Sequence, residues 1–142
     1  MLLERPVPVE RLPGFAEGDV SVQDAAAQRA AHNLELAAGQ RVLDACAAPG
    51  GKAGHILETA NVQLTALEAD AARCARLERN LARLHFDARI LCADCAKLAD
   101  WWDGVPFDRV LADVPCSASG IARRHPDVKW LRRSHDIGAF CL

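Results

Sequence analysis

The stretch RVLDACAAPGGK, residues 41–52, joins a short apolar run to a glycine-rich turn. Its first part, RVLDA at 41–45, is apolar and ends near an acid, which is typical of a strand buried in a parallel sheet. The adjacent Gly50 and Gly51 then allow a tight turn into a helix expected over 52–59. A buried strand, a glycine turn and a helix in this order predict the first unit of an α/β fold.

Beyond this unit, apolar strand-like runs alternate with helical patterns. The strands are expected at 64–67, 88–92 and 107–113, and the helices at 70–84 and, more briefly, 97–102. Such alternation produces right-handed βαβ units and therefore a parallel sheet covered on both faces. Upstream, prolines and glycines predict an extended lead-in over residues 1–22. Within and after it, a short strand is expected at 20–22 and a helix over 25–36 that Asp24 caps.

Composition limits the class of protein. The 142 residues are 51% hydrophobic and 25% charged, which is typical of one soluble globular domain and excludes a disordered tail or a fibrous repeat. No apolar run approaches the ~18 residues that a membrane helix needs, and the opening MLLERPVPVE is unlike a secretory signal. These features predict a cytoplasmic protein without a membrane partner. No feature of the sequence fixes an oligomeric state.

Six scattered cysteines are interpreted as reduced thiols in a chain that can build its own core. Cys92 and Cys95 form a C-x-x-C pair, which could be half of a zinc site, a redox pair or two packed thiols. A structural zinc site needs a second ligand pair, and the five histidines show no matching spacing. We therefore expect no metal.

The net charge is −2, but the charge is unevenly distributed. Between Ile121 and His135 there is one acid against five bases, which are Arg123, Arg124, Lys129, Arg132 and Arg133. This local excess predicts a docking place for a polyanion, and the alternative is a solvated helix face. Trp101, Trp102 and Trp130 could likewise stack on bases or pack in the core.

Acids recur where the predicted strands end, at Asp44, Glu68, Asp94 and Asp113. The carboxyl ends of parallel strands are where α/β proteins bind ligands, and an acid after the second strand can accept hydrogen bonds from ribose hydroxyls. The glycine turn lacks both the P-loop pattern and G-x-G-x-x-G, so a triphosphate or a nicotinamide dinucleotide is disfavoured. A nucleoside without a polyphosphate fits, and S-adenosylmethionine is the commonest such cofactor.

Four segments now carry a family resemblance. They are LPGFAEGDVSVQDAAAQ (12–28), LDACAAPGGK (43–52), DVPCSASG (113–120) and RRHPDVKW (123–130). Together they resemble the NOL/NOP/Sun family of RNA cytosine-5 methyltransferases, and within it the bacterial enzymes that act on small-subunit (16S) ribosomal RNA. The resemblance implies a Rossmann-like class I methyltransferase fold, S-adenosylmethionine as cofactor, ribosomal RNA as partner, and methylation of carbon 5 of cytosine.

The resemblance also implies roles for individual residues. The cofactor's methionine and ribose parts would be wrapped by Cys46, Ala47, Ala48, Pro49, Gly50, Gly51 and Lys52. Glu68 would hold the ribose, Asp94 would face the adenine, and Asp113 would lie between cofactor and cytosine. Cys116 would assist release of the product. RNA would meet Arg123, Arg124, Lys129 and Arg132. The sequence departs from the family pattern at Glu68, where aspartate is usual, at Ala53, where threonine is usual, and at Val114, where alanine is usual.

Carbon 5 of cytosine is a poor nucleophile, so a thiolate must first add to carbon 6. In this family the attacking cysteine stands in a later Thr-Cys-Ser motif, which is not found in these 142 residues. We therefore expect residues 23–142 to form a partial cofactor-binding domain, incomplete at its C-terminal end. The alternative is a non-catalytic module that binds S-adenosylmethionine or RNA. An adenine-N6 methyltransferase is disfavoured because Asp-Val-Pro-Cys at 113–116 offers no aromatic ring.

Without a Thr-Cys-Ser cysteine, these residues lack the nucleophile that the resemblance implies for this chemistry. The 142-residue chain alone should transfer no methyl group from S-adenosylmethionine to cytosine, as measured by incorporation of a labelled methyl group into ribosomal RNA. Methyl transfer that depends on Cys116 would show this expectation to be wrong.

Overall fold

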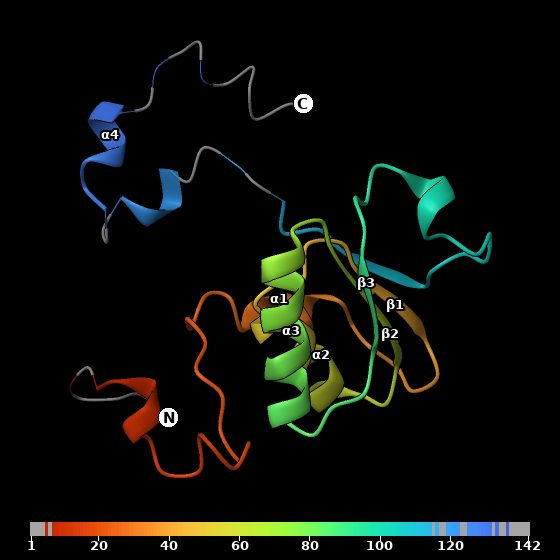
Figure 1. The fold of residues 1–142 in the computed structure, drawn as a ribbon, viewed down its shortest axis with the longest axis horizontal. Coiled ribbons are helices and arrows are strands. Elements are labelled where there is room, and N and C mark those ends of the chain that lie inside the picture. Colours follow the sequence, from red (N-terminus) through yellow and green to blue (C-terminus); the bar gives the residue numbers. More distant parts are fainter. Residues whose placement is uncertain are drawn as a thin grey trace.

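The computed structural model describes residue 5, residues 7–114, residue 116, residues 119–122, residues 125–131, and residues 133 and 136. Within these residues the strands form one four-stranded sheet (Figure 1). Its members are β1 (Arg41–Asp44), β2 (Gln63–Glu68), β3 (Arg89–Cys92) and β4 (Arg109–Leu111). All pairs are parallel, and the order is β3-β2-β1-β4. The predicted parallel α/β sheet is confirmed.

The strand β1, which was predicted at 41–45, is paired on both of its edges. Val42 is in register with Leu64 of β2 on one side and with Arg109 of β4 on the other. Asp44, the last residue of β1, lies between Ala66 and Leu111. Because both edges are hydrogen-bonded, the end of β1 and the turn that follows it are held at the centre of the sheet.

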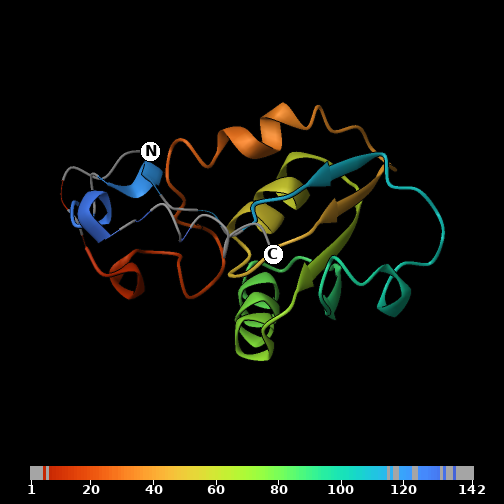
Figure 2. The ribbon, with the colours of Figure 1, turned by 90° about the horizontal axis from the view of Figure 1, so that it is seen from above.

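Three helices pack on one face of the sheet: α1 (Arg29–Asn33), α2 (Gly51–Thr59) and α3 (Ala71–Arg83) (Figures 1 and 2). The core between helices and strands contains Ala31, Val42, Ile56, Leu64, Ala66, Leu77 and Leu81. Each large side chain buried here stabilises the fold by about 1.5–3 kcal/mol. The helices predicted over 52–59 and 70–84 are thus confirmed, and their apolar stripes face the sheet.

The opposite face is covered by the segment between β3 and β4 rather than by an α-helix. Trp101 is buried there with Leu43 and Leu67, and its ring centroid lies 6.2 Å from that of Phe107. The helical stretch expected at 97–102 is only a 3-10 helix, Leu98–Asp100. Trp101 is therefore a core residue, as one of the two alternatives supposed.

The helix α3 begins where the sequence predicts. Asp70 has an extended backbone, and its Oδ1 accepts a hydrogen bond of 2.8 Å from the backbone amide of Arg73. This cap satisfies one of the free amides at the start of the helix, and substitution of such a residue commonly costs about 1 kcal/mol.

Two expectations for the segment before β1 are wrong. Residues 20–22 form no strand, and the carbonyl of Val20 instead accepts a hydrogen bond from the Arg83 guanidinium. The helix expected over 25–36 is reduced to α1, preceded by turns in which Asp24 accepts from the amide of Ala26. Only Ala31 of α1 is buried, so packing does not extend this short helix against the cost of helix nucleation.

The fourth strand is shorter than the expected 107–113. β4 pairs with β1 only opposite Val42–Asp44, because β1 then turns away into the glycine loop. β4 is also an edge of the described sheet, and Val110 is 53% exposed. The residues after Leu111 therefore leave the sheet before they reach Asp113.

Outside this sheet the chain forms short helical pieces. A 3-10 helix spans Val9–Arg11 near the start, and another spans Ser119–Ile121. The short helix α4 (Val128–Leu131) contacts the latter and lies away from the sheet in both Figure 1 and Figure 2. Within the described residues, none of the helices combines the length and the apolar character needed to span a bilayer.

Gly50 provides a prediction about stability. Its φ of +101° is unfavourable for other residues, and an added Cβ would lie 3.0 Å from Leu77 Cδ1 and 3.2 Å from Asn80 Nδ2. Gly50→Ala should lower the free energy of unfolding by about 2–3 kcal/mol in urea denaturation. Gly39→Ala is the matched control, because Gly39 also has positive φ but open space around it. Equal costs for both variants would contradict the role of the Leu77 and Asn80 contacts.

Candidate functional site

The loop from β1 to α2 is tied to the ends of its neighbouring strands. The amide of Ala45 donates to the carbonyl of Leu111 at 2.8 Å, and that of Ala47 donates to Leu67 at 2.9 Å. The turn closes with a bond of 2.8 Å from the Gly50 amide to the Ala47 carbonyl. The predicted loop is thus fixed over the carboxyl ends of β1, β2 and β4.

A cavity of about 230 Å³ opens beside this loop. Its lining consists of Cys46, Ala47, Ala48, Pro49, Gly51, Lys52 and Asp113, together with Val22, Gln23, Asp24 and Ala27. The structure therefore brings most of the predicted loop together with Asp113. The segment 22–27 was not among the predicted site residues, although it lies within the stretch 12–28 that carries the family resemblance.

One ion pair spans the cavity from α2 to the chain after β4. The ammonium of Lys52 is paired with Oδ2 of Asp113, and the two side chains are 27% and 59% exposed. The pair joins two sequence motifs that are 61 residues apart. Because Asp113 remains more than half exposed, its second oxygen is accessible to a ligand.

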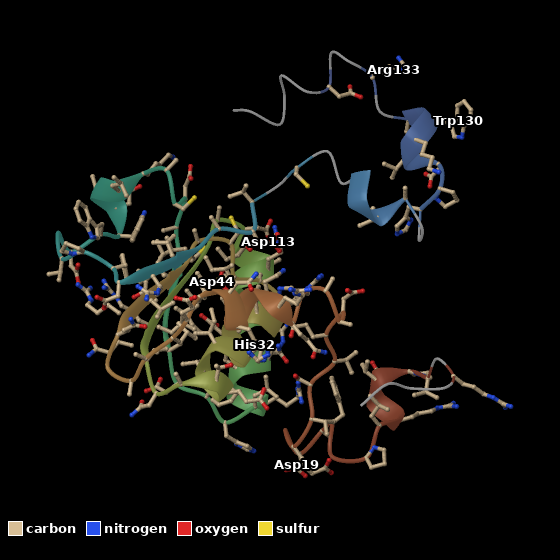
Figure 3. All side chains as sticks on the ribbon, turned by 180° about the vertical axis from the view of Figure 1, so that it is seen from behind. Asp19, His32, Asp44, Asp113, Trp130 and Arg133 are labelled. Atoms are coloured by element: carbon tan, nitrogen blue, oxygen red, sulfur yellow. The ribbon has the colours of Figure 1, made fainter. Side chains whose placement is uncertain are left out.

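Asp44 is the most unusual acid of the site. It is 1% exposed, and neither of its carboxylate oxygens has a hydrogen-bond partner among the described residues. Burial raises its pKa to about 6. The nearby Cys46 backbone amide, which points at the carboxylate without forming a hydrogen bond, and the charge of Lys52 lower this pKa, and the negative charge of Asp113 raises it. Figure 3 shows Asp44 and Asp113 at the same end of the sheet. A buried carboxylate without a partner favours a ligand that donates hydrogen bonds or carries positive charge.

Glu68 ends β2 and is 4% exposed. Its Oε1 accepts a hydrogen bond of 3.1 Å from the Asp70 amide. Its Oε2 lies 3.2 Å from Nη2 of Arg73, in an ion pair without hydrogen-bond geometry, so it retains capacity to accept hydroxyl donors. The same Arg73 nitrogen donates to the carbonyl of Ala48 at 3.2 Å. Arg73 thereby links the glycine loop to Glu68, a connection that sequence reasoning did not supply.

Asp94 lies after β3, outside this cavity. Its Oδ1 accepts from the amide of Ala96 at 3.0 Å, and its carbonyl accepts from Lys97 at 2.9 Å. This local turn explains an aspartate at the position without any ligand. Its expected contact with an adenine remains a prediction.

The cysteines divide into two environments. Burial, followed by the neighbouring Cys95, raises the pKa of the Cys46 thiol. Cys74 is buried in α3, and burial likewise raises its pKa. Cys116 is exposed after Asp113. In the part of the chain that the structure describes, no three His, Cys, Asp or Glu side chains are grouped to hold a metal ion.

The predicted RNA-binding residues are only partly described. Arg123, Arg124 and Arg132 lie outside the described residues. Lys129 is exposed on α4, beside Trp130, whose side chain is 85% exposed. Trp130 is therefore not a core residue, in contrast to Trp101.

Comparison with known proteins decides the family. The model of the family "16S rRNA methyltransferase RsmB/F" matches residues 31–141. The chain belongs to this family. The family resemblance predicted from the motifs of the glycine loop and of the segment after β4 is therefore confirmed. The sheet is that of a class I methyltransferase.

Curated relatives of the RsmB/F family extend the match to almost the whole chain. It is 54% identical over 140 residues to the ribosomal RNA small subunit methyltransferase B of Vibrio cholerae, covering 98% of this chain and 32% of the relative. It is 56% identical over 142 residues to the protein of the same name from Xanthomonas campestris, again covering 98% and 32%. The chain thus spans about a third of the length of these relatives.

A solved structure of the same class aligns closely with the fold. NSun6 from Pyrococcus horikoshii, whose crystal structure is with SFG, is 28% identical with a TM-score of 0.82. The alignment covers 95% of this chain and 35% of that one. This chain and NSun6 therefore have the same fold, although only 28% of their aligned residues are identical.

Asp44 predicts how stability depends on pH. Its pKa is about 6 in the folded chain against 3.8 for an ordinary aspartate, so the folded state binds the proton more tightly. Protonated Asp44 therefore contributes to the free energy of unfolding near pH 4. This contribution is lost as pH rises through about 6, a change of about 3 kcal/mol. Urea denaturation between pH 4 and 7 should show this loss of stability in the native chain and should not show it in Asp44→Asn.

Asp103 should change the stability of the fold with pH in the opposite direction to Asp44. Its bond with the Val105 amide, aided by Arg41, lowers its pKa, so its contribution is lost as pH falls. A native chain and an Asp44→Asn variant with parallel stability profiles between pH 4 and 7 would contradict the assignment to Asp44.

Proposed function

We propose that the protein to which these residues belong uses S-adenosylmethionine to methylate carbon 5 of a cytosine in 16S ribosomal RNA. The observation that carries this proposal is the identity of more than half of the residues, over 98% of the chain, with curated ribosomal RNA small subunit methyltransferases B. The chain would supply the cofactor-binding part of that activity, over residues 23–142, and residues 1–22 would form its lead-in.

The chemistry of the site supports a cationic nucleoside as cofactor. In the lining of the cavity, the carboxylates of Asp24 and Asp113 outnumber the single ammonium of Lys52. The buried carboxylate of Asp44 lies near Lys52 and Asp113 and adds to this negative charge. S-adenosylmethionine carries a sulfonium and an ammonium group, whereas a dinucleotide would bring negative phosphates close to these acids. The unpartnered oxygens of Asp44 fit the first ligand and disfavour the second.

Each neighbouring residue has a role that its geometry permits. The loop 46–52 would enclose the methionine and ribose parts, since Gly51 leaves open space where a side chain would otherwise stand. Glu68 would accept from the ribose hydroxyls through its Oε2, with Arg73 holding the carboxylate in place. Asp94 would face the adenine. This division follows the general placement of a nucleoside at the carboxyl ends of parallel strands.

The bound cofactor would supply an electrophilic methyl group. Asp113, held by Lys52, would orient the target cytosine beside it. The exposed Cys116 thiol stands three residues after Asp113 and would assist release of the methylated base. The thiolate that attacks carbon 6 is not assigned to any cysteine of these 142 residues, because none stands in a Thr-Cys-Ser motif.

A second candidate is a module that binds S-adenosylmethionine or RNA without catalysing a reaction. A module that binds S-adenosylmethionine would share the site at the glycine loop with the first candidate and would differ from it only in that no methyl transfer follows. A module that binds RNA alone would need no cofactor site there.

Calorimetric titration tests the cofactor. The chain should bind S-adenosylmethionine saturably and should not bind a nicotinamide dinucleotide. Gly51→Ala should weaken binding of S-adenosylmethionine about tenfold, or about 1.4 kcal/mol, because the added methyl would enter the space left for the ligand. Its folding stability should be unchanged or slightly higher, since no protein atom lies within 4 Å of the added carbon.

Gly104→Ala is the control for this titration, because it adds the same methyl group in an exposed turn that does not line the cavity. Gly104 has a φ of +81°, so this variant should be less stable than the native chain, but it should bind S-adenosylmethionine with native affinity. A folded chain that does not bind S-adenosylmethionine would overturn the cofactor assignment. Equal affinities of the native chain and Gly51→Ala would place the ligand elsewhere.

A further inference from the structure

The helix α3 carries four arginines that the site and the proposed mechanism use only in part. They are Arg73, Arg76, Arg79 and Arg83. Their separations of three and four residues place them along one side of the helix, with neighbouring Cβ atoms about 5–6 Å apart. The RNA-binding residues expected from the sequence lie in the later basic cluster, and these arginines are not among them.

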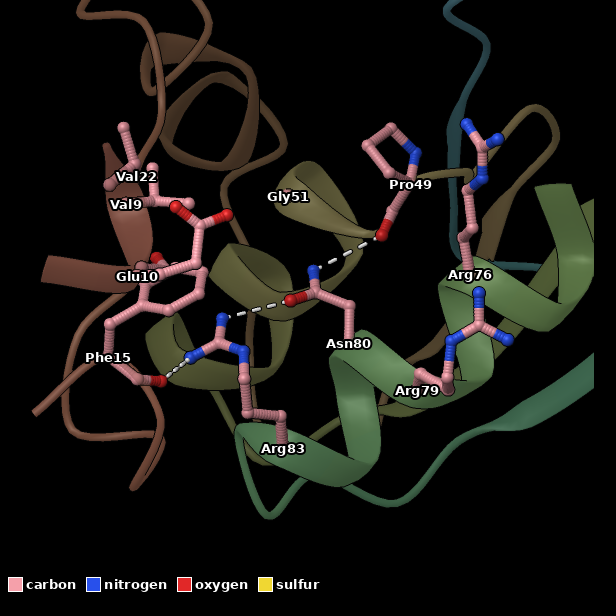
Figure 4. Close-up of a pocket in the computed structure, with 11 residues that line it drawn as sticks. Val9, Glu10, Phe15, Val22, Pro49, Gly51, Arg76, Arg79, Asn80 and Arg83 are labelled. Atoms are coloured by element: carbon pink, nitrogen blue, oxygen red, sulfur yellow. Dashed lines mark hydrogen bonds between the residues drawn. The ribbon is translucent and has the colours of Figure 1, made fainter. Parts of the chain in front are cut away.

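Three of these arginines line a cavity of about 620 Å³. Its walls are the C-terminal half of α3, the segment from Val9 to Val22, and the glycine loop at Pro49 and Gly51 (Figure 4). Arg76 and Arg79 stand along the α3 wall, opposite the segment that carries Glu10. The cavity is therefore a groove between the helix and the start of the chain.

One end of the groove is structurally fixed. Nη1 of Arg83 donates to the carbonyl of Phe15 at 2.5 Å, and its guanidinium lies 4.0 Å from the centre of the Phe15 ring. Nη2 of Arg83 donates to Oδ1 of Asn80, and Nδ2 of Asn80 donates to the carbonyl of Pro49. Arg83 and Asn80 therefore hold the three walls together and are already engaged.

The other two arginines are not engaged in this way. Among the described residues, Arg76 and Arg79 form no hydrogen bond or ion pair, and both side chains are exposed. Glu10 is the acid in the lining, against three arginines, so the groove has a net charge of +2. This excess stands out on a chain whose net charge is −2. Two unpaired guanidinium groups in one groove favour an anionic ligand with repeated charges.

The groove is continuous with the candidate cofactor site. Val22, Pro49 and Gly51 line both the groove and the cavity that contains Lys52 and Asp113. A chain-like ligand that follows α3 would therefore reach the glycine loop and the neighbourhood of the reacting residues.

We propose that the groove between α3 and the segment 9–22 binds the phosphodiester backbone of RNA through Arg76 and Arg79. This inference rests on the proposed function, because it takes the ligand to be the RNA whose cytosine enters the site. Arginine forks bind phosphate oxygens in pairs, and contacts to phosphates position a nucleic acid without reading its sequence. The groove thus sets the path of the RNA strand, while selection of the cytosine occurs elsewhere.

Binding of a labelled single-stranded RNA, measured by fluorescence anisotropy over a range of salt concentrations, tests the proposal. The double variant Arg76→Gln, Arg79→Gln should bind about five- to tenfold more weakly, and the slope of log affinity against log salt should fall by about 0.7 for each phosphate that an arginine no longer neutralises. The weakening should be the same for RNAs of unrelated sequence. Glu10→Gln should change affinity in the opposite direction, because it removes the acid from the groove.

Arg29→Gln is the matched control. Arg29 is an exposed arginine of α1 that lines neither cavity, and its replacement should leave affinity and salt slope unchanged. Thermal unfolding of each variant checks that the fold is kept, which is expected because Arg76 and Arg79 form no hydrogen bond or ion pair with the described residues. An unchanged affinity and slope for the double variant would overturn the proposal. A change in self-association instead, seen by sedimentation, would identify the groove as an interface between copies and also overturn it.

Titration with S-adenosylmethionine separates this proposal from the proposed function. A chain that binds the cofactor and binds RNA independently of Arg76 and Arg79 refutes the groove alone. A chain that binds RNA through these arginines but not the cofactor refutes the cofactor assignment and leaves the groove standing.

Discussion

The pairing of β1 on both of its edges is the constraint on which the rest of the structure depends. The strand is only four residues long, yet hydrogen bonds to β2 and β4 hold it at the centre of the sheet. The glycine loop leaves from its end and is bonded back to Leu67 and Leu111. Because the loop is held by both neighbouring strands, its binding surface is already formed. Binding of a ligand therefore costs little conformational entropy of the loop.

This fixed loop carries an electrostatic cost at Asp44. A carboxylate with 1% exposure and no hydrogen-bond partner among the described residues destabilises the fold when it is charged. Packing of α2 and α3 on the sheet keeps the residue buried in spite of that cost. Groups held in this way cluster at functional sites, where a ligand relieves the unfavourable state.

The distribution of charge explains how an acidic chain can engage RNA. Phosphate contacts need only a local group of cations, and the net charge of −2 limits binding elsewhere on the surface. The acids gather at the carboxyl ends of the strands, where a cationic cofactor is proposed, and the unpaired arginines line the adjoining groove. The two ligands therefore meet surfaces of opposite charge that share Pro49 and Gly51.

Local pattern predicted most of the sheet and the two long helices. The apolar runs of β1, β2 and β3 and the apolar positions of α3 are encoded within a few residues, so each could be read without knowing its neighbours. The motif at 43–52 likewise predicted the loop and its place at the end of a strand. The predictions of a short strand at 20–22 and of a long helix over 25–36 were wrong. The local sequence favours these elements, but residues 20–22 pair with no other strand and only Ala31 of α1 is buried.

Contacts between distant segments were decided by tertiary structure alone. The Lys52–Asp113 ion pair, the Arg73 link between Glu68 and Ala48, and the anchoring of Phe15 by Arg83 each join residues from separate elements. The burial of Asp44 and the freedom of Arg76 and Arg79 depend on which surfaces pack against them. By itself the sequence determined the order of chemical groups along the chain, namely a glycine loop followed by acids at successive strand ends. Only packing decided which of these groups are shielded from water and which have partners, because burial and pairing are properties of neighbours in space.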